Sequence, residues 1–161
     1  MEGQAEIEWP GRFDPRKAPV HVRNELTIDA PCASVCAWLV RAELWPTWYP
    51  NSRNINFIEK LPPDLQLGTK FGWNTFGVNL VSTVLEFIPE RRLAWSANGF
   101  GISAYHAWLL QKTEAGCRVV TEETQYGWLA RLNNRFRPNN MFSKHQNWLE
   151  SLADKARGGP P

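Results

Sequence analysis

The sequence has no large excess of charge of either sign. Its 18 basic and 16 acidic side chains leave a net charge of +2, and lysine and arginine form no continuous run. Binding to a phosphate backbone or to an acidic membrane surface normally relies on concentrated positive charge. We therefore expect no nucleic-acid partner.

Long apolar runs are also missing. No window approaches the roughly 18 to 20 apolar residues of a membrane span, and the amino terminus has no basic region followed by an apolar stretch. The sequence predicts a cytoplasmic protein without an integral membrane segment.

Cysteine and histidine are scarce. The three cysteines do not form a disulfide framework or a zinc motif, and Cys32 and Cys36, one helical turn apart, are interpreted as reduced core residues. His21, His106 and His145 are dispersed, and no phosphate-binding glycine loop, GxSxG elbow or HExxH motif occurs. The sequence requires neither a metal nor a cofactor.

Tryptophan, in contrast, is abundant. Nine tryptophans occur in 161 residues, and 12% of the chain is aromatic. Large aromatic side chains either fill a core or line the wall of a ligand pocket. Composition alone leaves both interpretations open.

The clearest local pattern covers residues 102–127. Apolar residues alternate with others over two segments joined by a short turn at 113–116, which predicts an antiparallel hairpin. If Lys112 pairs with Cys117, His106 lies opposite Glu123 on one face of the sheet, close enough for a hydrogen bond. Pairing residue 97 with residue 102 would place Leu93 opposite His106.

The remaining pattern predicts an α+β chain in one domain. A strand at 20–28 precedes two short helices. Six further strands follow, four at 54–60, 69–75, 78–88 and 93–97 and two in the hairpin. A helical tail begins at Trp128 and is interrupted at Pro138. We expect an amino-terminal arm at 1–19, a folded domain at 20–157 and a disordered tail at 158–161.

The order of these elements resembles that of the START-like superfamily, also called SRPBCC, which includes polyketide cyclases, dehydrases and lipid-transport proteins. The resemblance covers about residues 20–156. It rests on turn residues and apolar spacing at 28–31, Val35, Trp38, 45–48, 67–68, Pro89, 93–95, His106, 116–119, Glu123, Gly127 and 149–152. It implies a helix-grip fold, in which a curved seven-stranded antiparallel sheet wraps around a long carboxy-terminal helix and encloses a cavity.

Several functions are compatible with such a cavity. The first is binding of a small hydrophobic molecule, aromatic or polyketide-like. The second is a cofactor-independent cyclase, aromatase or dehydratase with His106 and Glu123 as an acid–base pair, in which the carboxylate makes the imidazole a general base near neutral pH. The pair could instead be purely structural, and a cavity filled by tryptophans would favour a protein-interaction module. The predicted ligand-binding residues are Trp48, Trp73, Leu93, Trp95, Trp108, Thr121 and Arg131.

Overall fold

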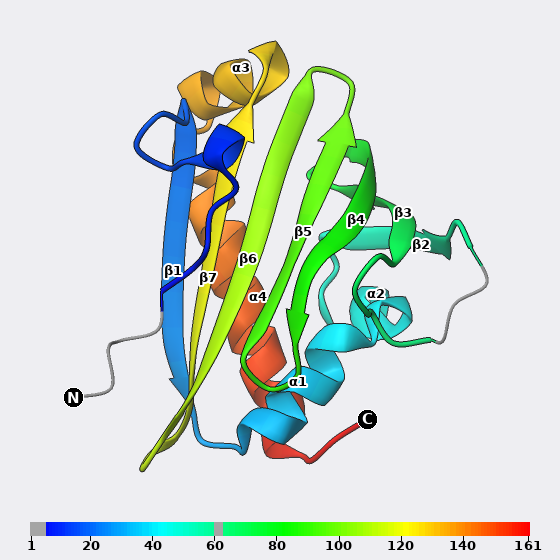
Figure 1. Cartoon of the computed structure of the whole chain (residues 1–161), viewed down its shortest axis with the longest axis vertical. Coiled ribbons are helices and arrows are strands. Elements are labelled where there is room, and N and C mark those ends of the chain that lie inside the picture. The colour runs from blue at the N-terminus through cyan, green and yellow to red at the C-terminus, as the bar shows by residue number, and fades with distance from the viewer. Residues whose placement is uncertain (1–5, 60–62) are drawn as a thin grey trace.

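The chain forms one seven-stranded antiparallel sheet whose concave face holds the long carboxy-terminal helix (Figure 1). The computed structural model describes residues 6–59 and 63–161. The first five residues of the predicted arm, the predicted strand end at Lys60 and the start of the next loop therefore lie outside the described residues. The sheet order is β1-β7-β6-β5-β4-β3-β2. The predicted helix-grip architecture is confirmed.

The elements follow the predicted order along the chain. The strands are β1 (Val20–Ile28), β2 (Ser52–Phe57), β3 (Lys70–Thr75), β4 (Val78–Ile88), β5 (Arg92–Gly99), β6 (Ile102–Thr113) and β7 (Gly116–Tyr126). The helices are α1 (Cys32–Val40), α2 (Trp45–Trp48), α3 (Trp128–Phe136) and α4 (Asn140–Arg157), with short 3₁₀ turns η1 (Gly11–Phe13) and η2 (Ala42–Leu44). Among these helices, not one has the length and apolar composition needed to cross a bilayer.

The β6–β7 hairpin has the predicted register. Lys112 pairs with Cys117, and His106 pairs with Glu123. Gly116 has a φ of 121°, a conformation that side chains with a Cβ rarely adopt, so the glycine fixes this end of the hairpin. The alternation of β6 then directs Ala104, His106 and Trp108 towards α4.

The predicted register between β5 and β6 was wrong by two residues. Ala97 pairs with Ala104, and Trp95, not Leu93, pairs with His106. The turn consists only of Phe100 and Gly101, because Gly101 adopts a φ of 70° and lets both strands continue to their ends. A shift of two residues leaves every side chain on its predicted face.

The prediction that Cys32 is reduced was also wrong. Cys32, at the start of α1, forms a disulfide with Cys117, at the start of β7, across 85 residues of sequence. Ile28 pairs with Cys117 in the β1–β7 ladder, so the short connection after β1 returns the chain to this position. Cys36 remains a thiol.

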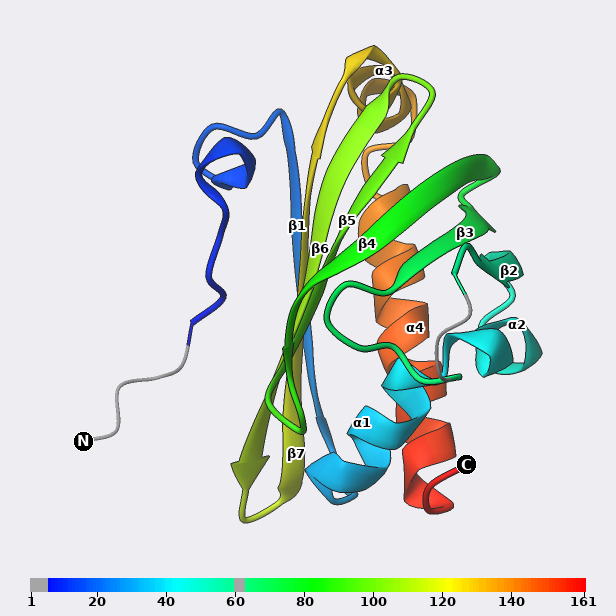
Figure 2. The same ribbon diagram turned by 45° about the vertical axis from the view of Figure 1, so that its right-hand side comes forward.

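Residues 6–19 of the amino-terminal arm lie against the convex face of the sheet over β5, β6 and β7 (Figure 2). Phe13 stacks on Tyr105 with 5.4 Å between ring centroids, and its carbonyl accepts a hydrogen bond from Thr124. Trp9 also packs against Tyr105. At the other terminus, the Trp38 indole donates a hydrogen bond to the carbonyl of Gly159. The division into arm, domain and tail stays a prediction.

The break at Pro138 divides the helical tail into α3 and α4. The two helices meet at the upper end of the sheet (Figure 1). There α3 also contacts the β5–β6 turn. Leu129 N–H donates to the carbonyl of Gly101, and a Cβ at Gly127 would collide with that same oxygen. Gly127 is therefore needed for α3 to approach the turn so closely.

Candidate functional site

A cluster of aromatic side chains fills the lower part of the space between the sheet and α4. Trp45 contacts Trp148 with ring centroids 5.2 Å apart and Trp95 with centroids 5.5 Å apart. Tyr49 stacks on Trp148 at 4.4 Å. The first pair packs edge to face, the second is tilted and the third is stacked. Aromatic quadrupoles favour edge-to-face and offset-stacked pairs. The abundance of tryptophan is thus explained in large part by core packing.

A cavity of about 80 Å³ remains above this cluster. Its walls are mostly apolar or aromatic on the side of the sheet, whereas the end near α3 and α4 is polar. The apolar and aromatic lining residues are Val20, Trp73, Phe76, Val78, Leu80, Trp95, Ala97, Ile102, Ala104, Ala130, Met141 and Trp148, and the polar ones are Thr75, His106, Glu123, Gln125, Asn133, Asn134, Arg137, Asn140 and His145.

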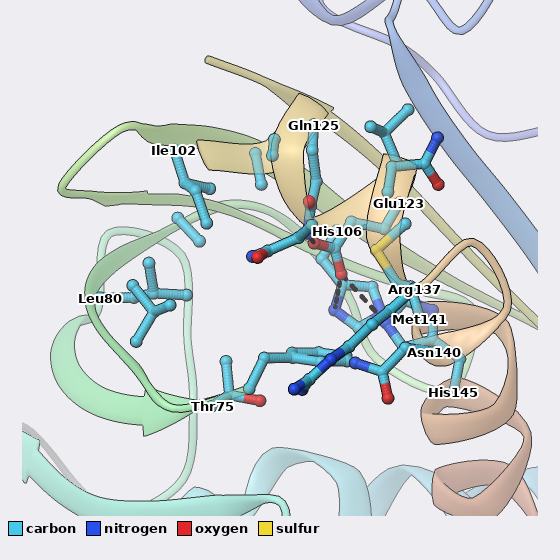
Figure 3. A pocket seen from close by; sticks show the side chains of 18 of the residues that line it. Thr75, Leu80, Ile102, His106, Glu123, Gln125, Arg137, Asn140, Met141 and His145 are labelled. Atoms are coloured by element: carbon cyan, nitrogen blue, oxygen red, sulfur yellow. Dashed lines mark hydrogen bonds and ion pairs between the residues drawn. The ribbon is translucent and has the colours of Figure 1, made fainter. Parts of the chain in front are cut away.

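Two histidines and one glutamate form the polar wall of the cavity (Figure 3). Oε2 of Glu123 lies 3.0 Å from Nε2 of His145 and 3.3 Å from Nδ1 of His106. The two imidazole rings are nearly parallel, with centroids 4.7 Å apart. All three side chains are buried.

Further hydrogen bonds fix the orientation of this cluster. Gln125 donates from Nε2 to Oε1 of Glu123 at 2.6 Å. Nε2 of His106 lies 2.7 Å from Oγ1 of Thr121, and Trp108 stacks on the His106 ring. Both ring nitrogens of His106 therefore have partners. Nδ1 of His145 is buried and has no hydrogen-bond partner among the described residues.

Burial and charge shift the protonation equilibria of two members in defined directions. Burial lowers the pKa of His106 to about 3, and the opposing effect of the Glu123 charge is smaller. Burial by itself would raise the pKa of Glu123, but its contacts with His145, His106 and Gln125 together lower it to about 2. His106 is thus a neutral ring at pH 7, whereas the sequence had predicted a general base near neutral pH.

The same cluster has the composition of a metal-ligand set. His106, Glu123 and His145 each offer one ligand atom, and these atoms lie within 4.8 Å of one another. Two histidines and a carboxylate bind several transition metals. Here Oε2 of Glu123 occupies the point towards which both ring nitrogens are directed. A metal ion would have to displace the carboxylate from that point.

The predicted site residues have three different positions. Trp73, Trp95, His106 and Glu123 line the cavity. Thr121 and Trp108 do not line the cavity but contact the His106 ring. The last three are further away: Leu93 is buried in the core, Trp48 packs against Trp38, and Arg131 is exposed on α3.

Sequence reasoning did not assign His145, Gln125 or Arg137 to the site. Gln125 lies two residues after Glu123 on the same strand, so alternation places both on one face. His145 shares a helical phase with Met141 and Trp148, which predicts the buried face of α4 but not its distance from the sheet. Arg137 extends over the pocket from the end of α3 (Figure 3), and no sequence signal distinguishes it from Arg131.

Comparison with known proteins agrees with the fold. The profile of a family described as polyketide cyclase / dehydrase and lipid transport matches residues 19–157. No curated protein sequence matches the chain. A hypothetical protein from Helicobacter pylori has a crystal structure with 31% sequence identity and a TM-score of 0.88, and the match covers 97% of this chain and 99% of that one.

More distant structures share the fold alone. A protein from Thermus thermophilus matches with a TM-score of 0.72 at 17% identity, over 88% of this chain and all of the other. A di-domain ARO/CYC protein, StfQ, from the steffimycin biosynthetic pathway matches with a TM-score of 0.71 at 13% identity, over 86% of this chain and 51% of that one.

Proposed function

Because the chain belongs to the polyketide cyclase / dehydrase and lipid transport family, we propose that it binds one small, flat and largely apolar molecule in the cavity above the aromatic cluster. The observation that supports this most directly is the asymmetric lining of the cavity. Trp73, Trp95 and Trp148 form flat apolar walls, and Glu123 and His145 form a polar end. Ligand sites typically combine such walls with a few polar groups that orient the ligand.

Unpaired polar atoms in the lining favour an oxygen-bearing ligand. The indole nitrogens of Trp95 and Trp148 are buried and have no acceptor among the described residues, and Nδ1 of His145 likewise has no partner there. Buried polar groups are nearly always hydrogen-bonded in folded proteins. A carbonyl oxygen would serve as an acceptor for an indole N–H, and a hydroxyl group would also serve as a donor to the imidazole nitrogen.

The size of the cavity limits the ligand further. A volume of about 80 Å³ is well below the several hundred Å³ of a site for a drug-sized molecule. It suits one aromatic ring with short substituents. A multi-ring polyketide would require side chains at the mouth, such as Arg137 and Met141, to move outward. The presence of the cavity above the tryptophan cluster also makes a pure interaction module the less supported alternative.

The first experiment is native mass spectrometry of the gently purified protein, followed by release of any bound molecule. We also expect 4-nitrophenol, a single ring with two short substituents, to quench tryptophan fluorescence in a saturable way, because three tryptophans line the cavity. Ala104→Leu places a larger side chain in the cavity and should abolish both signals, whereas Ala115→Leu makes the same change at an exposed turn and should preserve them. A bare protein mass together with the absence of saturable quenching would refute the proposal.

One observation favours a second candidate, an acid–base enzyme such as a cyclase, aromatase or dehydratase. Glu123 and His145 lie 3.0 Å apart at the cavity wall. If Nε2 of His145 donates to the carboxylate, Nδ1 is left as a proton acceptor without a partner among the described residues, which is the state a general base needs. His106 would then be a positioning residue, because both of its nitrogens are engaged.

The two candidates are separated by the fate of the bound molecule. An enzyme should convert the molecule released from the protein, or its immediate precursor, and His145→Gln should abolish that conversion. Thr121→Val, which removes only the contact behind His106, should reduce the rate modestly, by about tenfold or less. Binding without conversion by the wild-type protein would support ligand binding and refute the enzymatic candidate.

A further inference from the structure

We propose that α3 and the β5–β6 turn form a docking surface for a lipid bilayer that contains anionic lipids. Four large apolar side chains, here called the α3 surface, are exposed at this end of the molecule. They are Phe100 in the turn and Trp128, Leu132 and Phe136 on α3, with exposed fractions of 78%, 56%, 44% and 72%. Phe100 packs edge to face against Trp128 at 5.4 Å, which joins the turn to the helix.

The orientation of α3 is opposite to that of an ordinary surface helix. Trp128, Leu132 and Phe136 recur every four residues and form one exposed stripe. The opposite side carries Asn133 and Asn134, which line the cavity. A helix of a globular protein normally turns its apolar stripe inward. An outward stripe of Trp, Leu and Phe is instead typical of helices that lie in a membrane interface.

The charge around the α3 surface complements an anionic bilayer. Residues 124–149 include Arg131, Arg135, Arg137 and Lys144 but no aspartate or glutamate. Within residues 6–59 and 63–161, none of these four cations makes an ion pair. The near-zero net charge of the whole chain predicted no acidic-membrane patch. The fold nevertheless gathers these cations at one end.

A second copy of the chain is a weaker fit to this surface. Most homodimers are two-fold symmetric and bring the same patch of each subunit together. Such contact would bring Arg131 and Arg135 of both subunits into one interface, and like charges in close contact are unfavourable. A bilayer with anionic headgroups accepts both the apolar stripe and the cations flanking it.

Docking would also bring the cavity mouth to the membrane. Asn133, Asn134 and Arg137 line the pocket from the inner side of the helix whose outer side carries the stripe. An apolar ligand could then pass between the lipid phase and the cavity without crossing bulk water. The docking surface itself is independent of the proposed ligand, so the vesicle experiment can fail or succeed whatever the cavity binds.

The test is co-sedimentation of the full chain with vesicles of phosphatidylcholine alone and of phosphatidylcholine with about 30% phosphatidylserine. We expect binding only to the anionic vesicles, weakened when ionic strength rises from about 0.1 M to 1 M, because the Debye length falls from about 10 Å to 3 Å. Trp128 should show a blue shift of its fluorescence on binding, since its exposed ring would enter a less polar environment.

Matched variants separate the two contributions to binding. Phe136→Asp should abolish sedimentation, whereas Leu67→Asp, at a comparably exposed apolar residue in the loop before β3, should not. Replacing both Arg131 and Arg135 by glutamine should weaken binding roughly 30-fold, given the usual gain per cation near an anionic surface. Replacing Arg91 and Lys112 by glutamine changes the net charge equally and should have little effect.

Three outcomes would overturn the proposal. The first is the absence of binding to either kind of vesicle. The second is binding that the two arginine substitutions leave unchanged. The third is a dimer in analytical ultracentrifugation that Phe136→Asp dissociates, because the α3 surface would then be covered by a second copy of the chain.

Discussion

The neutral state of buried His106 should make the protein sensitive to mild acid. A histidine in an unfolded chain titrates with a pKa of about 6.5, whereas burial lowers the pKa of His106 in the folded protein to about 3. Between these two values the unfolded state binds more protons than the folded state. Stability is therefore complete above pH 6.5 and falls as the pH falls towards 3.

The size of this effect at pH 5 follows from the linkage relation. At 1.5 pH units below the unfolded pKa, and at about 1.36 kcal/mol per unit, His106 alone should cost about 2 kcal/mol of unfolding free energy. The charged or titratable groups that face it are Glu123 and His145. Glu123, whose folded pKa is about 2, stays ionised in both states down to pH 5 and adds little in this range.

Urea denaturation followed by tryptophan fluorescence at pH 8 and pH 5 measures this contribution. The wild type should lose about 2 kcal/mol more than His106→Gln between the two pH values, a difference of about 1 M in the urea midpoint. His106→Phe gives a second replacement that cannot titrate and retains a ring between Trp108 and His145. Equal losses in the wild type and both variants would show that His106 protonates in the folded state and would refute the reasoning.

Three further predictions concern the disulfide, the buried glutamate and the arm. Reduction of the Cys32–Cys117 bond, which spans 85 residues, should lower the free energy of unfolding by about 4 kcal/mol; thermal unfolding with and without reductant checks this, and an unchanged transition would contradict it. Glu123→Gln removes the buried charge between two histidines and should destabilise the fold by about 2 kcal/mol or more. Glu114→Gln, which removes an exposed charge in the turn before the same strand, should cost less than about 1 kcal/mol in the same urea assay, and equal costs would argue against a special role for the buried cluster. Phe13→Ala removes the ring through which the arm packs on the sheet and should lower the free energy of unfolding by about 3 kcal/mol. No measurable change in that free energy would mean that the arm adds no stability.

Local patterns in the sequence predicted the β6–β7 pairing because one short turn sets the register of the whole hairpin. His106 and Glu123 were placed opposite each other for this reason. The β5–β6 register was missed because 98–101 contains two glycines, and the pattern does not reveal that only Gly101 lies in the turn. A shift by two residues preserves the face but changes the neighbour, so Trp95 rather than Leu93 contacts His106.

Contacts between segments that are distant in the sequence could not be predicted from local patterns. The disulfide depends on β1 pairing with β7, a contact between the first and last strands that no local pattern specifies. His145 belongs to the site because α4 crosses the sheet at one particular height. Alternation and helical phase predict which face a residue occupies, but the position of a helix along a sheet is set by packing of many side chains.

The amino-terminal arm on the convex face reduces the number of positions in β6 that can be substituted without loss of stability. In a sheet with one wet face, half the positions of a central strand tolerate polar or larger residues. Here Tyr105 and Ala107 on β6 are as buried as His106 and Trp108, which point the other way. Neither face of β6 therefore tolerates polar or larger residues in the middle of the strand. Among related chains, substitutions in β6 should be confined to its two ends unless the arm changes as well.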